Sequence, residues 1–266
     1  MKFIAIGILF VVCGAVIGNH AGNGMEYRLN RHKRQAKKWK DGAMPLRVIN
    51  YYFNDDSRTG LFKNLFMRVL KAWEKDTCVK FEEKREATSI LVRADSGPEC
   101  SYTDNNPRMK MMYIGCGYSG GIAHEVGHAL GLEHTHTRHD RDDYLIVNWT
   151  NVQSYKQQNK NMTREENENY GVPYDYGSIM HYGSSGPNPT MIPKDKDYHR
   201  TMVSALISFT DLAVVNKHYK CGELCDPKTS AKCTRDGFPN PNNCSTCVCP
   251  SGYGGQLCDQ QVTSTS

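Results

Sequence analysis

The stretch from residue 124 to residue 134, HEVGHALGLEH, constrains the fold of this chain more than any other. His124 and His128 are four residues apart, so on an α-helix their side chains leave the same face about one turn apart. Gly131 follows within a turn and adopts positive φ at no steric cost, which ends the helix and turns the chain back. That turn brings His134 toward the other two imidazoles. The spacing therefore predicts a helix, a sharp turn and three converging histidines.

Three imidazoles suit Zn²⁺, with Zn–N bonds of about 2.0–2.1 Å, and three protein ligands leave a position open for water. Such a site is typical of catalysis, because the ion lowers the pKa of its water to about 7. Glu125 lies beside a ligand and is expected to take a proton from this water as it attacks a carbonyl, then to pass it to the leaving amine. We therefore expect one Zn²⁺ per chain, held by His124, His128 and His134, with Glu125 as the general base.

The length of the pattern argues against coincidence. With 10 His in 266 residues, H-E-x-x-H arises by chance in roughly 2% of such chains, and the pattern extended to Gly131 and His134 in roughly five in 100,000. The alternative, an amphipathic helix with surface histidines, is disfavoured by these odds. His136 and His139 are rival ligands by residue type, but their spacing from Gly131 is wrong, so we place them outside the ligand set.

The first 34 residues are predicted to be removed from the mature protein. An apolar run at 3–17, short for a membrane span, follows a basic residue and predicts a signal peptide over 1–18. An uncleaved signal anchor is the alternative. The R-x-K-R sequence at 31–34 has the form cut by processing proteases of the secretory pathway, which predicts a propeptide over 19–34. Since no other segment is long and apolar enough to span a bilayer, we expect a secreted, extracellular protein with no membrane span.

Charge and cysteine content fit that compartment. Removing residues 1–34 takes away five of the 33 Lys and Arg and one of the 28 Asp and Glu, which leaves a net charge of about +1 and implies no nucleic-acid partner. Loss of Cys13 leaves ten of the eleven cysteines, an even number, as a disulfide framework requires.

The mature chain divides into two parts of different composition. Residues 35–221 are interpreted as one domain, 222–259 as a small cysteine-dense module, and 260–266 as a disordered tail. Beyond residue 141 the large domain is rich in Asn, Tyr, Gly and Pro with little periodicity, which predicts a large irregular half.

Regular elements are predicted mainly before that point. Apolar residues at three- and four-residue spacings predict a helix over 59–76, and the histidine motif predicts a second helix from 122 to about 130. Strand-forming segments are predicted at 46–53, 79–81, 89–94 and 109–114.

The histidine motif, followed by R-H-D-R-D at 138–142 and S-I-M-H-Y at 178–182, resembles the astacin family of metzincin zinc peptidases. W-x-x-G-x-x-P at 39–45 is also similar to that family, and the cysteine-dense module makes the nematode astacin-like peptidases the most similar type. The resemblance covers most of the mature chain. It implies an α+β fold, with a twisted mixed sheet and helices above the cleft and an irregular half below.

The resemblance also implies roles for single residues. Met180 would lie in a turn that packs beneath the metal, supporting the site as Gly131 does. Tyr182 would be a further zinc ligand in the resting enzyme, and on substrate binding it would swing away to hydrogen-bond the tetrahedral oxyanion. Two disulfides are implied in the large domain, Cys78–Cys221 and Cys100–Cys116.

Three features depart from the family's pattern. Thr135 stands where the family usually has a Glu that helps anchor the mature N-terminus, so the docking of Gln35 is left open. Residues 19–34 contain no Asp, so the family's F-x-G-D latency device is missing there. The stretch from Cys100 to Cys116 is short, which affects the expected strand on the substrate side.

The cysteine-dense module ends in C-x-C-P-x-G-Y-x-G-x-x-C and resembles an EGF-like domain. Six cysteines allow fifteen pairings by sequence alone, and a zinc knuckle is the rival interpretation, disfavoured in an oxidising compartment. The resemblance implies the pairs Cys225–Cys244, Cys233–Cys247 and Cys249–Cys258. The N-x-[ST] pattern predicts N-glycosylation at Asn148, Asn161 and Asn243.

The sequence thus predicts a secreted zinc metalloendopeptidase that hydrolyses peptide bonds of extracellular protein or peptide substrates. The alternative, from a different class, is an inactive astacin-like protein that binds an extracellular partner through its EGF-like module. Glu125 discriminates between them, because an inactive relative usually loses the base or a ligand, and here all four motif residues are present.

Overall fold

The computed structural model describes residues 47–54, 59–95, 97–106, 109–152, 156, 158–184 and 186–262. These residues all belong to one of the two units into which the chain divides, residues 31–266. The predicted signal peptide (1–18), the propeptide (19–34) and the W-x-x-G-x-x-P sequence lie outside the described residues. Every helix within the described ranges is too short or too polar to cross a lipid bilayer.

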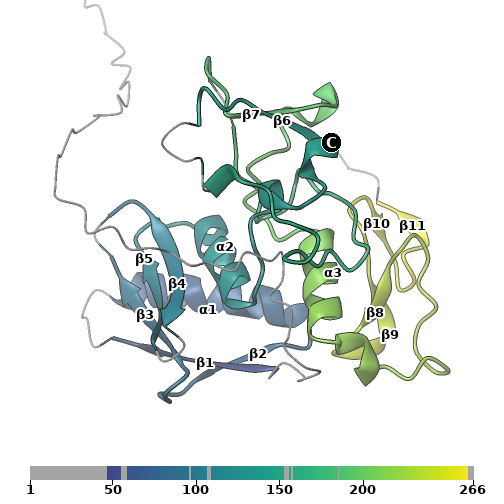
Figure 1. Ribbon diagram of the computed structural model, residues 1–266. Helices are drawn as coiled ribbons and strands as arrows, with labels where there is room; N and C mark the ends of the chain where they lie inside the picture. The colour runs from purple at the N-terminus through teal and green to yellow at the C-terminus, as the bar shows by residue number, and fades with distance from the viewer. Residues whose placement is uncertain are drawn as a thin grey trace, which may run out of the picture. The chain divides into compact units, whose positions relative to one another are not determined.

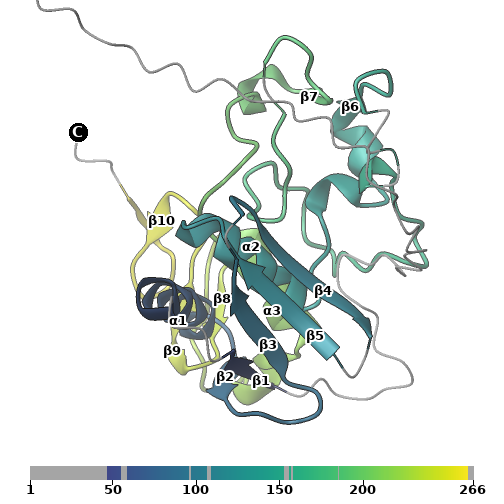
Figure 2. The ribbon, with the colours of Figure 1, turned by 90° about the vertical axis from the view of Figure 1, so that its left-hand side faces the viewer.

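A five-stranded sheet forms the first half of the large domain, with the strand order β2-β1-β3-β5-β4. β2, β1, β3 and β5 run parallel, whereas β4 at the edge is antiparallel to β5. Figure 2 shows the sheet with its strands side by side. The strands are β1 (Val48–Phe53), β2 (Lys80–Glu83), β3 (Ile90–Ala94), β4 (Cys100–Asn106) and β5 (Met109–Ile114).

Four of these strands lie where strand-forming residues predict them, whereas no such pattern predicted β4, and only the resemblance implied a strand on the substrate side between Cys100 and Cys116. Its residues, CSYTDNN, are mostly polar, and such an edge strand lacks the apolar alternation from which strands are recognised.

The first helix, α1 (Thr59–Lys75), confirms the prediction made from its apolar spacing. Phe66, Val69 and Trp73 are buried in the core between this helix and the sheet. The Trp73 indole donates a hydrogen bond of 3.3 Å to the carbonyl of Ala123, which ties α1 to the second helix. Figure 1 shows the two helices lying together next to the sheet.

The second helix, α2 (Ser119–Ala129), begins three residues earlier than predicted and includes Gly120. A Cβ on Gly120 would lie 2.9 Å from the Cα of Ala205, so glycine permits a close backbone approach here. Gly131 has φ of +91°, as the motif predicted. The chain therefore turns back directly after α2.

Beyond α2 the large domain is mostly irregular, as its composition predicted. Its described residues form short 3₁₀ turns, η2 (Thr135–Thr137), η3 (Arg141–Asp143) and η5 (Lys196–Tyr198), and a two-stranded sheet, β6 (Leu145–Val147) with β7 (Met191–Pro193). A second apolar cluster holds this part together, made of Leu145, Tyr174, Tyr176, Met191 and Met202.

A third helix, α3 (Phe209–His218), was not predicted from the sequence. It begins with a capping box in which the Ser208 hydroxyl and the Asp211 carboxylate each bond the other residue's backbone N–H. The S-x-x-D sequence at 208–211 could have revealed this start. The disulfide Cys78–Cys221 joins the end of the domain, just past α3, to the segment before β2.

The C-terminal module, residues 222–261, begins within the turn η6 (Cys221–Leu224) and contains little regular structure. Its strands are β8 (Phe238–Asn240), β9 (Asn243–Val248), β10 (Tyr253–Gly254) and β11 (Gln260–Gln261). The disulfides in the structure are Cys78–Cys221, Cys100–Cys116, Cys225–Cys244, Cys233–Cys247 and Cys249–Cys258, the same pairs that the resemblance implied.

The prediction of a disordered tail from residue 260 is wrong for its first two residues. Gln260 and Gln261 pair antiparallel with Gly254 and Tyr253, because backbone hydrogen bonds hold this polar pair although it buries no apolar side chain.

Asparagines of the C-terminal module cap the end of α1. The Asn242 amide donates hydrogen bonds of 2.8, 3.1 and 3.0 Å to the carbonyls of Glu74, Lys75 and Thr77. The Asn240 amide bonds the Lys75 carbonyl as well, at 3.2 Å. The last carbonyls of a helix have no partner within the helix, so these amides satisfy the carbonyls of Glu74 and Lys75 at the end of α1. Side-chain hydrogen bonds, as well as the covalent backbone, thus join the C-terminal module to the large domain.

Asn242→Ala is expected to lower the free energy of unfolding by about 1–3 kcal/mol, because the two amide protons that three carbonyls share are lost and each hydrogen bond is worth about 0.5–1.5 kcal/mol net. Urea denaturation measures the change. Asn54→Ala, at an exposed asparagine whose side chain makes no described contact, serves as the control and is expected to have little effect. Equal unfolding free energies for the two variants would contradict this account of how the module docks.

Candidate metal centre

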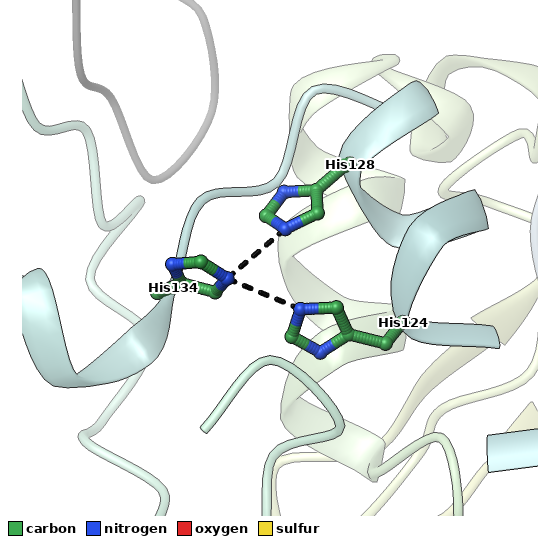
Figure 3. Close-up of side chains that lie close together, drawn as sticks. All are labelled: His124, His128 and His134. Atoms are coloured by element: carbon green, nitrogen blue, oxygen red, sulfur yellow. Dashed lines mark hydrogen bonds between the residues drawn. The ribbon is translucent and has the colours of Figure 1, made fainter. Parts of the chain in front are cut away.

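Three histidine side chains converge at the C-terminal half of α2. His124 and His128 extend from one face of the helix, and His134 reaches them from the segment that follows Gly131, as Figure 3 shows. The Nε2 atom of His134 lies 3.1 Å from the Nε2 atoms of both His124 and His128. The three are the group of metal-ligating side chains found among the described residues.

The protons on these rings decide what can bind between them. His124 Nδ1 lies 2.7 Å from the carbonyl oxygen of Ile179, and His128 Nδ1 lies 2.8 Å from that of Leu132. A carbonyl only accepts hydrogen bonds, so each Nδ1 carries the proton and donates it. The Nε2 atoms of His124 and His128 therefore present lone pairs toward His134. Burial also lowers the pKa of His124, which keeps its ring neutral.

The donor set fits a zinc ion. A tetrahedral ion with Zn–N bonds of about 2.0–2.1 Å separates two ligand nitrogens by about 3.3 Å, close to the 3.1 Å contacts in the structure. The His134 ring can donate one proton at most through its Nε2, so it cannot satisfy two facing lone pairs as well as a cation does. Carbonyl partners on Nδ1 are the usual outer contacts of histidines that ligate a metal through Nε2.

Glu125 lies next to this centre, with 8% of its surface exposed. It lines a groove of about 700 Å³ together with His124, His128 and His134. The general base predicted from the sequence and the three predicted ligands therefore border the same space.

Tyr182 lies against the third histidine. Its ring centroid is 4.1 Å from that of His134, 4.5 Å from that of His136 and 6.1 Å from that of His124. His136 is fully buried, and burial moves its pKa well below the ordinary value, so it is a neutral ring beneath the tyrosine. The Tyr182 ring is thus confined between imidazoles at the edge of the metal centre.

The two rival histidines lie outside the trio. His136 Nε2 is 3.2 Å from the carbonyl of Gln158, and its ring stacks on His134 at 5.3 Å. His139 Nδ1 is 2.6 Å from the side-chain oxygen of Asn167. Both rings are engaged by groups other than the metal-ligating atoms.

Met180 packs under α2, with 1% of its surface exposed. A Cβ on Gly127 would lie 2.5 Å from its sulfur, so the methionine reaches this place only because residue 127 has no side chain. Sequence reasoning missed Gly127, although it is the residue directly before His128. The role of Gly127 depends on its packing against Met180, and the spacing of a sequence motif does not indicate such a contact.

Thr135 is buried at the position where the sequence departs from the family's pattern. Its hydroxyl donates a hydrogen bond of 2.8 Å to Ser178 Oγ, and Ser178 in turn donates one of 2.6 Å to Asp211. Burial raises the pKa of Asp211 to about 6. Nothing in the sequence indicated this chain of polar side chains, and the docking of Gln35 lies outside the described residues.

The groove runs along the edge of the sheet. Its lining includes Cys100, Ser101 and Tyr102 of β4, and the segment 203–205 forms another part of its wall. Among the described lining residues, Glu99 and Glu125 carry carboxylates, and none is Lys or Arg. An extended peptide laid against β4 would therefore pass the three histidines.

The predicted glycosylation acceptors are not buried. Asn148 and Asn161 are partly exposed in the irregular half, and Asn243 is exposed in the C-terminal module. The Asn161 amide also bonds Asp142 at 3.3 Å.

Comparison with known proteins places these features in one family. The family model described as Astacin, a family of peptidases, matches residues 31–220. Zinc metalloproteinase nas-31 of Caenorhabditis elegans is 42% identical over 243 residues, which are 87% of this chain and 39% of that protein. Zinc metalloproteinase nas-17 of the same organism is 35% identical over 243 residues, 88% of this chain and 54% of that protein. The chain thus spans about two fifths to one half of these curated relatives.

A solved structure is also similar. High choriolytic enzyme 1, a hatching enzyme zinc-protease from Oryzias latipes (Medaka fish), matches with a TM-score of 0.56 and 30% identity. The match covers 65% of this chain and 89% of that one. The mixed α+β fold expected from the sequence is therefore the fold of a zinc protease of known structure.

Proposed function

The chain belongs to the astacin family of zinc peptidases, and from this premise we propose that it is a secreted zinc metalloendopeptidase that hydrolyses peptide bonds of extracellular proteins. One observation carries the proposal. The unprotonated Nε2 atoms of His124 and His128 face the third imidazole at 3.1 Å, in a groove that also holds a carboxylate. Three imidazole ligands, an open side and a base make a hydrolytic site rather than a structural one.

Zinc bound to the three histidines supplies Lewis acidity and brings the pKa of a coordinated water to about 7. The Glu125 carboxylate accepts a proton from the attacking water, then delivers it to the nitrogen of the leaving amine. Its place in the groove, next to the ligand His124 in the chain, puts this transfer beside the three imidazoles.

The chain's other residues hold the reacting groups. The carbonyls of Ile179 and Leu132 fix the rings of His124 and His128 through Nδ1, so the Nε2 lone pairs keep their direction. We assign Tyr182 as the further ligand of the resting site. In the reaction its hydroxyl donates a hydrogen bond to the substrate oxygen as negative charge develops there.

Substrate binds along the edge of the sheet. Among the described strands β4 pairs with β5 alone, and three of its residues line the groove. An unpaired edge offers backbone N–H and C=O groups to an extended peptide, which adds as a further strand. Because backbone groups carry this binding, we expect cuts at internal sites of many sequences, as an endopeptidase makes.

The extracellular location follows from the signal peptide predicted over 1–18 and from five disulfides, which persist in oxidising compartments. We further propose that the protein is a zymogen processed after Arg34, that it carries glycans at Asn148, Asn161 and Asn243, and that the C-terminal module is EGF-like. The three disulfides of that module support its assignment as EGF-like, and an extracellular partner would bind there.

Cleavage of an unfolded protein tests the proposal. Residues 35–266 are incubated with reduced, alkylated casein, and the products are identified by mass spectrometry. We expect internal cuts that stop when a zinc chelator is added. Removal of residues from the ends alone would indicate an exopeptidase. Intact casein, with zinc bound to the protein, would favour the inactive protein that acts through its C-terminal module.

A further inference from the structure

Asp211 does more than begin a helix. It accepts a 2.8 Å hydrogen bond from the backbone N–H of Ser208 in the capping box of α3. A capping carboxylate usually lies at the surface, but only 4% of Asp211 is exposed. The same carboxylate also accepts bonds from the Ser178 hydroxyl, at 2.6 Å, and from the Ile179 backbone N–H, at 2.8 Å. It therefore joins α3 to the turn that carries Met180.

That turn contacts the metal centre on two sides. The Ile179 carbonyl accepts the proton of His124 Nδ1, so its position sets the direction of the first ligand. Ser178 Oγ accepts bonds from the Thr135 hydroxyl at 2.8 Å and from the Met180 backbone N–H at 3.0 Å. Thr135 directly follows His134, the third ligand, and its own backbone N–H bonds the Met180 carbonyl at 3.0 Å.

The direction of the hydrogen bonds is determined at each step. A hydroxyl has one donor and two acceptor sites, and Ser178 uses all three, donating to Asp211 and accepting from Thr135 and Met180. Asp211 receives only donors, so an ionised carboxylate, which accepts and never donates, fits the site. An amide of the same size would direct its NH₂ group at one of these donors. The network accordingly selects a carboxylate by chemistry and not by shape alone.

We propose that Asp211 is a positioning residue for the zinc ligands: through Ser178 and Ile179 it fixes the turn that orients His124 and the segment that carries His134. The inference rests on the proposed zinc site. It assigns a role in metal binding to a residue of α3 that makes no contact with the ligand rings among the described hydrogen bonds. It also explains how Thr135 is used at a position where the family usually has a Glu.

The affinity for zinc tests this role, measured in the full chain by competition with a chelator of known affinity. Asp211→Asn is expected to raise the zinc dissociation constant about 10- to 100-fold, the usual effect of losing an outer partner of a metal ligand. Ser208→Ala is the matched control, because it weakens the same capping box but leaves the bonds to the turn in place. It is expected to bind zinc as the wild type does.

Thr135→Val tests the hydrogen bond from the Thr135 hydroxyl to Ser178. It keeps the shape of the side chain and removes the hydroxyl, so we expect weaker zinc binding, and Thr135→Ser should restore it. Thr77→Val is the control, because Thr77 is also buried and its hydroxyl donates to the Trp73 carbonyl, far along the chain from the site.

The outcomes separate the possibilities. If Asp211→Asn binds zinc with wild-type affinity, or if Asp211→Asn and Ser208→Ala lose the same zinc affinity, Asp211 acts only as a helix cap and the proposal is overturned. If Asp211→Asn does not fold, Thr135→Val decides. Unchanged affinity in that variant overturns the proposal, and a loss that Thr135→Ser restores supports it. A wild-type chain that binds no zinc would instead refute the proposed function, and this inference with it.

Discussion

Replacing Glu125 by Gln is expected to lower kcat about 10²- to 10⁴-fold while zinc stays bound, because a positioned general base contributes about that factor. Glutamine has the size of glutamate but accepts no proton at neutral pH. The three imidazoles are unchanged, so the metal content should equal that of the wild type. Kinetics on a peptide substrate, with metal analysis of the same samples, measures both quantities.

Glu99→Gln is the matched control, since Glu99 is the other carboxylate that lines the described groove. It removes the same charge from the same space without removing the base, so we expect a much smaller effect on kcat. A Glu125→Gln variant that cleaves at the wild-type rate would mean that another group takes the proton. Equal losses in the two variants would mean that the charge of the groove matters and not the base.

Replacing His128 by Ala is expected to abolish stable zinc binding. Two imidazoles would remain of three, and loss of a ligand should exceed the 10- to 100-fold cost of losing an outer partner. His128 lies near the end of α2, and its Nδ1 already bonds the Leu132 carbonyl, so the ring is oriented to present Nε2 to the metal. Metal analysis after dialysis against zinc-free buffer measures the loss, and peptidase activity should disappear with it.

His139→Ala serves as the control for that variant. His139 was a rival ligand by residue type, and in the structure it bonds Asn167 instead. It should retain one zinc per chain. Full zinc content in the His128 variant, or loss of zinc in the His139 variant, would show that the ligand set is assigned wrongly.

The elements around the metal could be predicted because their signals are local. The helix that carries His124 and His128, and the turn at Gly131, follow from spacing over eleven residues and from the φ that glycine tolerates. Helix α1 follows from apolar periodicity, and its buried face confirms this. Periodicity and turn chemistry are properties of adjacent residues, so one sequence displays them.

What was missed depends on contacts between distant segments. The polar strand β4 exists because β5 pairs with it. Helix α3 is the exception, because the S-x-x-D sequence at its start is a local signal that was overlooked. The link from Asp211 to Ser178 joins residues 33 positions apart. Gly127 has a role only because Met180 packs on it. Spacing within a motif does not report such tertiary contacts.

Thr135 illustrates the difference. In the sequence, Thr135 stands where the family usually has a Glu, and the sequence indicates no other residue that takes over the role of that Glu. In the structure its hydroxyl begins a chain of hydrogen bonds that ends on a buried carboxylate. The short polar side chain of Thr135 thus helps to hold the segment after His134 in place. The sequence alone shows only that the family's usual Glu is missing at this position.

Titration of metal-free protein with zinc shows whether a single zinc ion makes this chain a peptidase. Residues 35–266 are stripped with a chelator, zinc is added in steps, and cleavage of a peptide is followed at each step. We expect no cleavage without zinc, a linear rise to one equivalent per chain, and a plateau beyond it. Cleavage by the metal-free protein, or a rise that continues to two equivalents, would contradict a single zinc ion held by His124, His128 and His134.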